Sequence, residues 1–291
     1  MTKVNTREMA ALMVQKIMDQ GEYSHVLLRR TLAACPELEK RDRAFITRMV
    51  TGTVERCLFL DYGINRVSST RVSKMKPFIR AVLRISAYQI FYMDSVEDRA
   101  ACNEGVNLVK KHGLRNLSGF ANGVLRALIR NKDQLLALEG IDDPAERESL
   151  TYSVPRWITG RWHQMFSADA VRQILEGISE EAPLTVRINQ SLASTEQVKQ
   201  SLEQDGVSWK PGPWFPGSLI LSGSVPPDQL KSFRRGWIQI QDTSSQTVGA
   251  AADPEAGCCI IDVCAAPGGK TMDVTDRLRG TGHVWACDLT E

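Results

Sequence analysis

The residues best suited to chemistry form a run of small side chains near the C-terminal end of the sequence. The run reads Ile261-Asp262-Val263-Cys264-Ala265-Ala266-Pro267-Gly268-Gly269-Lys270-Thr271. The apolar segment 259–263 before it predicts a buried strand, and 270–278 predicts a helix after it. Small residues let a backbone approach a ligand closely, and a helix N-terminus offers free N–H groups with a positive partial charge. The segment therefore predicts a ligand-binding loop.

An acidic residue completes this pattern. The segment 283–288 predicts a second strand, and Asp288 ends it, about 20 residues beyond Gly268. In nucleotide-binding folds an acidic side chain at this position accepts hydrogen bonds from ribose hydroxyls. We therefore expect Asp288 to hold the ribose of a nucleoside ligand.

Three types of nucleotide loop compete for this segment, beside a purely structural glycine-rich turn. A phosphate-binding Walker loop needs glycine at position 264, where the sequence has Cys264. A dinucleotide fingerprint fails because Gly280-Thr281-Gly282 follows a helix and lacks the third glycine. The loop of S-adenosylmethionine (SAM) methyltransferases tolerates the observed pattern, and the structural turn stays open as the alternative.

Asp262 to Thr271 resembles the SAM motif of the RNA cytosine-C5 methyltransferases, and Gly236 to Gln246 resembles the segment before that motif. The second segment also predicts a helix whose capping box joins Thr243 and Gln246. The resemblance implies SAM as the cofactor. The residues implied to bind it are Cys264, Ala265, Ala266, Pro267, Gly268, Gly269, Lys270 and Asp288.

The first part of the chain is basic and helical in pattern. Most of the 36 Lys and Arg side chains lie in residues 1–140, and most of the 34 Asp and Glu side chains follow them. Apolar side chains recur at helical spacing after Asn5 or Thr6, either of which can cap a helix, and Pro77 can begin another. Four segments are similar to signatures of the NusB-like helical domain: 41–45, 50–53, 87–90 and 119–126.

The pattern changes after residue 140. Residues 141–235 predict a linker helix and a small α/β domain, with an alternating strand at 184–189 and a helix at 195–204. Residues 236–291 predict the N-terminal part of a Rossmann-like SAM methyltransferase domain. A two-stranded parallel sheet cannot bury both of its faces, so we expect this domain to be incomplete and the chain to be truncated.

A NusB-like domain joined to this methyltransferase type is the arrangement of the bacterial 16S rRNA cytosine-C5 methyltransferases. The resemblance implies an all-α RNA-binding bundle at 1–140, a small α/β domain, and a Rossmann-like domain that methylates C5 of a cytosine in 16S ribosomal RNA. Two alternatives remain: a non-catalytic NusB-like RNA-binding protein acting in transcription or ribosome assembly, and a cytosine-C5 methyltransferase with another RNA acceptor.

The family catalyses with cysteines in Pro-Cys and Thr-Cys motifs, and neither dipeptide occurs in this sequence. A thiolate must add to C6 of cytosine before C5 can attack a methyl group. Cys264 lies in the cofactor loop, so we expect it to contact SAM and not to act as the nucleophile. We assign no catalytic residue, expect the nucleophilic cysteine beyond Glu291, and expect these 291 residues alone to be inactive.

Phosphate contacts by Lys and Arg provide much of the affinity for RNA. The candidates are Arg41, Arg43, Arg48, Lys110 and Lys111, with Arg7, Arg29, Arg30 and Arg115 also considered; for each, a solvated helix face is the alternative. The aromatic loop 209–217 offers stacking surfaces for bases, or a loop packed by its own aromatic rings.

Composition sets further expectations. Seven cysteines without a CxxC pair and four scattered histidines predict neither a disulfide framework nor a metal site. The polar N-terminus and the lack of a long apolar run indicate no signal peptide and no membrane span. We expect a cytoplasmic, monomeric protein.

Overall fold

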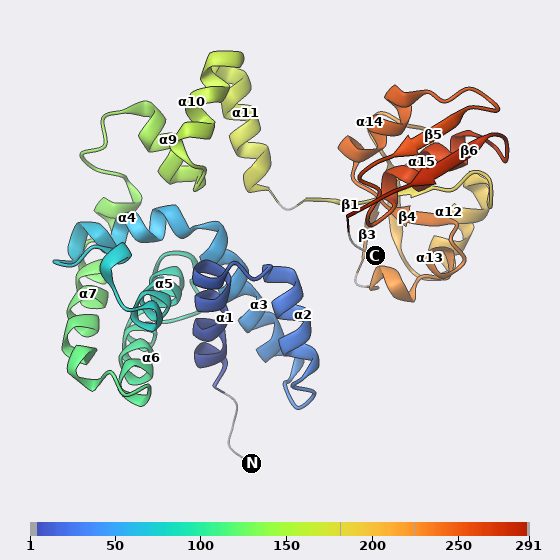
Figure 1. Cartoon of the computed structure of the whole chain (residues 1–291). Coiled ribbons are helices and arrows are strands. Elements are labelled where there is room, and N and C mark those ends of the chain that lie inside the picture. The colour runs from blue at the N-terminus through green and yellow to red at the C-terminus, as the bar shows by residue number, and fades with distance from the viewer. Residues whose placement is uncertain (1–4, 181, 224, 290–291) are drawn as a thin grey trace. The chain divides into compact units, whose positions relative to one another are not determined.

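The computed structural model describes residues 5–180, 182–223 and 225–289. The chain divides into two compact units, residues 1–179 and residues 180–291 (Figure 1). Unit 1 is helical and unit 2 contains the strands, so the predicted order of an all-α region followed by a small α/β region is confirmed.

Helices build unit 1 around one central member. The helices of its main bundle are α1 (Thr6–Gln20), α2 (Ser24–Ala33), α3 (Lys40–Glu55), α4 (Cys57–Val67), α5 (Pro77–Tyr92), α6 (Asp98–Lys111), α7 (Ser118–Arg130) and α8 (Lys132–Leu136). Asn5 caps α1 by accepting a hydrogen bond from the Glu8 N–H, and Pro77 begins α5. Helix α5 contacts α1, α3, α4, α6 and α7 and is buried along most of its length.

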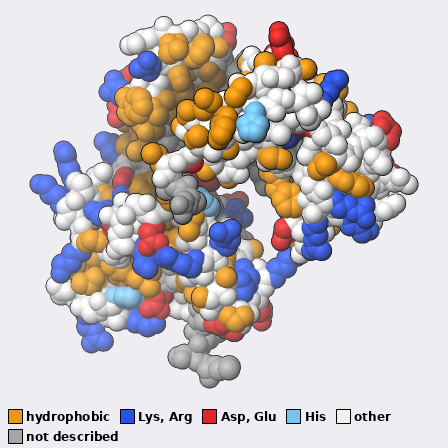
Figure 2. Space-filling view, turned by 45° about the vertical axis from the view of Figure 1, so that its right-hand side comes forward, with side chains coloured by type: hydrophobic (Ala, Val, Ile, Leu, Met, Phe, Trp, Pro, Cys, Tyr) orange, Lys and Arg blue, Asp and Glu red, His pale blue; other side chains and the backbone are white. Residues whose placement is uncertain are grey.

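Three more helices complete unit 1: α9 (Pro144–Tyr152), α10 (Arg156–Met165) and α11 (Ala168–Ser179). They share a small core of their own, formed by Val154, Val171 and Leu175 with Trp162 packed against it. Several large apolar side chains on α10 and just after it remain exposed, including Trp157 and Met165. Hydrophobic side chains gather at this end of unit 1 in the space-filling view (Figure 2).

Unit 2 begins with a four-stranded antiparallel sheet in the order β2-β3-β1-β4. Its strands are β1 (Leu184–Ile188), β2 (Ser208–Pro211), β3 (Ser218–Ser222) and β4 (Ile238–Ile240), and its helices are α12 (Thr195–Gln204) and α13 (Lys231–Arg234). The chain order β-α-β-β-α-β with this strand order is the ferredoxin-like arrangement. Strand β2 overlaps the start of segment 209–217, for which the sequence indicated a loop.

The two faces of this sheet differ in chemistry because side chains alternate along a strand. Val186 and Ile188 of β1 belong to an apolar core that also contains Val198 and Leu202 of α12. Arg187 points to the opposite face, opposite Gln239 of β4 in the strand register. That polar face is buried too, since Arg187 is only 6% exposed.

The rest of unit 2 is α14 (Thr243–Ala252), β5 (Cys259–Asp262), α15 (Gly269–Arg277) and β6 (His283–Ala286). Strands β5 and β6 are parallel, with Ile261 opposite Trp285. Both of these side chains are exposed, at 65% and 56%, so one face of the two-stranded sheet is uncovered. Helix α14 does not begin at the predicted cap: Asp242 is the N-cap, because its side chain accepts the Ser244 N–H, and Thr243 is already helical.

Candidate functional site

Asp262, the last residue of β5, organises the loop that follows. One of its carboxylate oxygens, Oδ1, accepts the Cys264 N–H at 3.2 Å. The other, Oδ2, accepts the Thr271 hydroxyl at 2.6 Å and so ties the first turn of α15 to the end of β5. The loop is therefore fixed at both of its ends by one side chain.

The two residues that follow β6 hold the middle of the same loop. The Ala265 N–H donates to the Cys287 carbonyl at 2.9 Å, and the Ala266 N–H donates to Asp288 Oδ2 at 2.8 Å. These bonds bring Asp288 against the loop, as expected for neighbouring parallel strands whose carboxyl ends meet at one edge. The Ala266–Pro267 peptide bond is cis.

The helix N-terminus after this loop is bare. Gly268 is the N-cap of α15, has no side chain to cap it, and adopts a left-handed φ of 98°. A Cβ added to Gly268 would meet no atom within 4 Å, so the space above the loop is open to solvent. The first N–H groups of a helix have no acceptor within the helix, and they attract anionic groups.

These donors and acceptors fit SAM. The N–H groups at the start of α15 suit a carboxylate, and the Asp288 carboxylate suits ribose hydroxyls because each of its oxygens can accept more than one hydrogen bond. Cys264, Ala266, Pro267 and Lys270 are exposed on the loop, where a ligand can reach them. The structure thus gathers all the residues implied to bind SAM, and their contact with the cofactor stays a prediction.

The RNA-binding candidates occupy two places in unit 1. Arg41, Arg43 and Arg48 lie on α3, and Lys110 and Lys111 lie in the last turn of α6. Both places border α1, which packs against α3 and whose Glu8 forms an ion pair with Lys111. Lys and Arg side chains are spread over unit 1 with Asp and Glu among them (Figure 2).

The individual side chains differ in how freely they can reach a phosphate. Arg43 donates three hydrogen bonds to the carbonyls of Leu32, Cys35 and Leu38, at 2.7 to 3.0 Å. Its guanidinium therefore holds the turn between α2 and α3, and its role as an RNA contact stays a prediction. Arg41, by contrast, is exposed at the start of α3.

The other candidates are also placed by the structure. Arg48 is exposed and donates to the Tyr92 carbonyl at 3.2 Å. Lys110 is exposed and borders a hollow of about 500 Å³ that is lined mainly by polar side chains: Asn103, Asn107, Ser118 and Asn122. Lys110 therefore has polar neighbours but no acidic one among the residues of this hollow.

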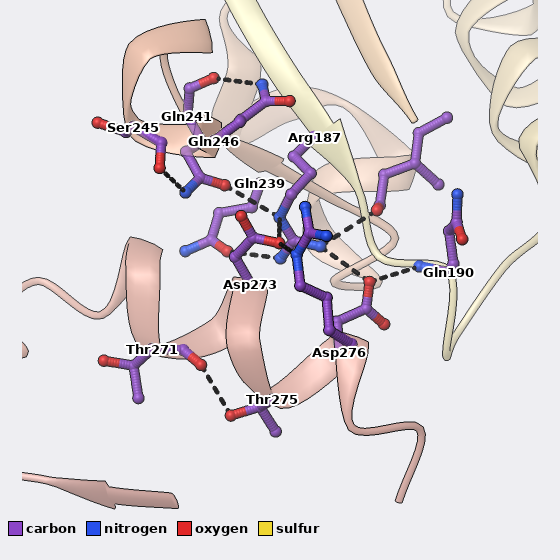
Figure 3. Close-up of polar contacts among 12 residues, drawn as sticks. Arg187, Gln190, Gln239, Gln241, Ser245, Gln246, Thr271, Asp273, Thr275 and Asp276 are labelled. Carbon is purple, nitrogen blue, oxygen red and sulfur yellow. Dashed lines mark hydrogen bonds and ion pairs between the residues drawn. The ribbon is translucent and has the colours of Figure 1, made fainter. Parts of the chain in front are cut away.

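Sequence reasoning missed a buried polar cluster in unit 2. Arg187 pairs with Asp276 of α15 at 2.9 Å, and Arg277 pairs with Asp273 at 2.9 Å (Figure 3). The signal available in the sequence was Arg187, a charged residue between the two core residues Val186 and Ile188. The alternation rule assigns Arg187 to a solvated face, so its burial was not predicted.

A hollow of about 1220 Å³ borders this cluster, at the end of α15 that lies away from the loop. The charged groups that line it are Arg187, Arg277, Arg279, Asp253, Asp273 and Asp276. Positive and negative groups balance, so the hollow has no excess charge that would attract phosphate.

Within 5–180, 182–223 and 225–289 no group of three His, Cys, Asp or Glu residues is arranged to hold a metal ion. Across the same ranges, none of the helices combines the length and apolar character needed to span a bilayer.

Comparison with known proteins gives two family matches. Residues 4–130 match the NusB family, and residues 154–228 match the ferredoxin-like domain of RsmF/B-like methyltransferases. The solved structure of PH0851 aligns with 99% of this chain and 65% of its own length, at a TM-score of 0.74 and 18% identity, and so shares the fold.

Curated relatives align along nearly the whole chain. A Bacillus subtilis protein called probable ribosomal RNA small subunit methyltransferase B is 29% identical over 99% of this chain, and a Synechocystis protein of the same name is 32% identical over 98%. The chain spans 64% of the length of each. The chain thus contains a NusB-type domain followed by an RsmF/B-type ferredoxin-like domain, and it is similar along nearly its whole length to proteins named ribosomal RNA small subunit methyltransferase B.

Proposed function

We propose that the protein acts in SAM-dependent methylation of C5 of a cytosine in 16S ribosomal RNA. In this proposal residues 1–140 are the RNA-binding domain, 141–235 a linker helix and small α/β domain, and 236–291 the start of the methyltransferase domain. The observation that carries the proposal is the bare N-terminus of α15 with the Asp288 carboxylate held against the loop before it. The names of the relatives support an rRNA substrate.

Each part of the site has a separate task. When bound, SAM supplies an electrophilic methyl group. The N–H groups at the start of α15 orient its carboxylate, and Asp288 fixes its ribose, which together set where the methyl group points. Attack by C5 of cytosine requires a thiolate on C6, and we assign that step to no cysteine of this chain.

Transfer of a labelled methyl group tests the proposal. The protein, expressed from its own gene, is incubated with methyl-tritiated SAM and unmodified 16S rRNA or small subunits, and the hydrolysed RNA is analysed. Tritium in 5-methylcytosine that is lost in an Asp288→Ala variant supports the proposal. Label in transfer RNA only would indicate another acceptor. RNA binding without SAM binding or label would indicate a non-catalytic NusB-like protein.

A further inference from the structure

Helix α15 is anchored at both ends, and only one anchor belongs to the loop already described. At its start, Thr271 is tied to Asp262 of β5. From its middle to its far end, Asp273 and Asp276 contact the ferredoxin-like sheet and α14. The second anchor joins two parts of unit 2 that are distant in sequence.

Arg187 of β1 is the centre of the second anchor (Figure 3). Its Nη1 donates to Asp276 Oδ2 at 2.9 Å, its Nε to Gln241 Oε1 at 2.9 Å, and its Nη2 to Gln239 Oε1 at 3.3 Å. The Arg187 side chain is 7% exposed and that of Asp276 is 9% exposed. Loss of either partner would therefore leave a buried charge without compensation.

Asp276 also holds the turn that follows β1. Its Oδ1 accepts the Ser191 N–H at 2.8 Å, and its Oδ2 accepts the Gln190 N–H at 3.0 Å. The Ser191 hydroxyl donates to Oδ1 as well, at 2.5 Å. One carboxylate from α15 thus satisfies an arginine and two backbone groups of the ferredoxin-like domain.

Asp273, one turn earlier, extends the contact to α14. Its Oδ1 accepts Arg277 Nε at 2.9 Å and lies 3.7 Å from Arg187 Nε. Its Oδ2 packs against the backbone of Gly249, where an added Cβ would lie only 2.3 Å away. The cluster contains two arginines and two aspartates, so its charges balance inside the unit.

We propose that Arg187 and Asp276 are positioning residues for the cofactor loop. A helix is stiff and the loop continues directly into α15, so an anchor that fixes α15 also fixes the N–H groups at Gly268 and Gly269. Binding sites need their groups held within about 0.5 Å, and supporting contacts provide this. The ferredoxin-like sheet is then part of the frame of the cofactor site. This inference rests on the proposed function.

The test compares variants that lose one contact each. Asp276→Asn removes the charge that Arg187 needs, and Arg187→Lys keeps the charge but loses the forked geometry. Asp205→Asn is the matched control: Asp205 accepts the Lys231 N–H at 2.9 Å in the same unit without touching α15. Each protein is measured for SAM affinity by calorimetry and for thermal unfolding.

We expect Asp276→Asn and Arg187→Lys to weaken SAM binding by about tenfold or more, because the loop shifts with α15. The control should unfold at a lower temperature with unchanged SAM affinity. Wild-type SAM affinity in folded Asp276→Asn and Arg187→Lys would overturn the inference, as would equal losses in the control.

Hydrogen exchange separates this inference from the proposed function, since it needs no SAM. In Asp276→Asn or Arg187→Lys, the amides of 264–278 should exchange faster than in the wild type, and in Asp205→Asn they should not. If the wild type binds no SAM, the cofactor assignment fails while exchange still decides whether the anchor exists. Unchanged protection of 264–278 would refute the anchor.

Discussion

The Asp288 carboxylate accepts the backbone N–H of Ala266, so the residue two positions after β6 directly supports the loop that follows β5. The same carboxylate accepts the Leu289 N–H through its other oxygen. Asp288 therefore shapes the loop itself, in addition to the ribose contact that we propose for it.

Asp288→Ala should weaken SAM binding and leave RNA binding intact. The change removes both the proposed ribose contact and the support of Ala266. A charge-assisted hydrogen bond is worth roughly 1.5–3 kcal/mol, so we expect a loss of about tenfold to a hundredfold in SAM affinity by calorimetry. Glu203→Ala removes one exposed carboxylate from α12 of the same unit and is the control. Equal SAM affinity in wild type and Asp288→Ala would refute the role of Asp288.

The cysteines should divide into two classes of reactivity. Burial raises the pKa of Cys57 to about 11, so its thiolate is scarce at neutral pH, while Cys259, Cys264 and Cys287 are exposed. We expect alkylation of Cys57 to be about a hundredfold slower than that of Cys264. The rates are measured by mass spectrometry of the alkylated peptides. Saturating SAM should slow the alkylation of Cys264, the cysteine of the loop; Cys259, at the other end of β5, is the control. Protection of Cys259 but not Cys264 would place SAM elsewhere.

The bundle should lose stability in acid through Glu8. Its hydrogen bond with Lys111 lowers the pKa of Glu8 below the ordinary 4.5, with a further hydrogen bond to His112 acting in the same direction. A lowered folded pKa stabilises the bundle above the unfolded pKa, and this contribution is lost as pH falls through the folded value. Glu8→Gln should therefore reduce the difference in unfolding free energy between neutral pH and acid. An unchanged pH profile, measured by urea unfolding, would contradict this.

Two arginines on α3 should respond differently to removal. Arg41 is exposed, so Arg41→Gln should weaken RNA binding and reduce the slope of affinity against salt by about 0.7 per phosphate lost. Arg43→Gln should instead lower the unfolding temperature, because three backbone carbonyls lose the hydrogen bonds that the guanidinium donates to them. A reduced salt slope in Arg43→Gln without loss of stability would show that Arg43 contacts RNA.

Local signals were sufficient for much of the fold. Asn5 and Pro77 mark helix starts through their own hydrogen bonding and ring geometry, and the structure begins helices there. The loop at 264–268 could also be predicted, because glycine and short side chains after an apolar strand allow a tight turn and a close approach to a ligand.

Long-range contacts were not readable in the same way. Periodicity assigns Arg187 to a solvated face, whereas its burial depends on Asp276, which lies far along the chain. The strand at Ser208–Pro211 ends in proline and pairs only at the edge of the sheet, so its own residues give a weak signal. The cap of α14 differed by one residue because the Asp242 side chain accepts the Ser244 N–H, which places Thr243 inside the helix.

The close approach of Gly249 to Asp273 has a genetic consequence. In the middle of a helix alanine is normally favoured over glycine by about 1 kcal/mol. Helix propensity alone would therefore favour alanine at position 249 of α14. An alanine there would collide with the Asp273 carboxylate. A Gly249→Ala allele should therefore be damaging although alanine is the better helix former, and Asp273→Ala should not rescue it, because Arg277 would lose its ion-pair partner.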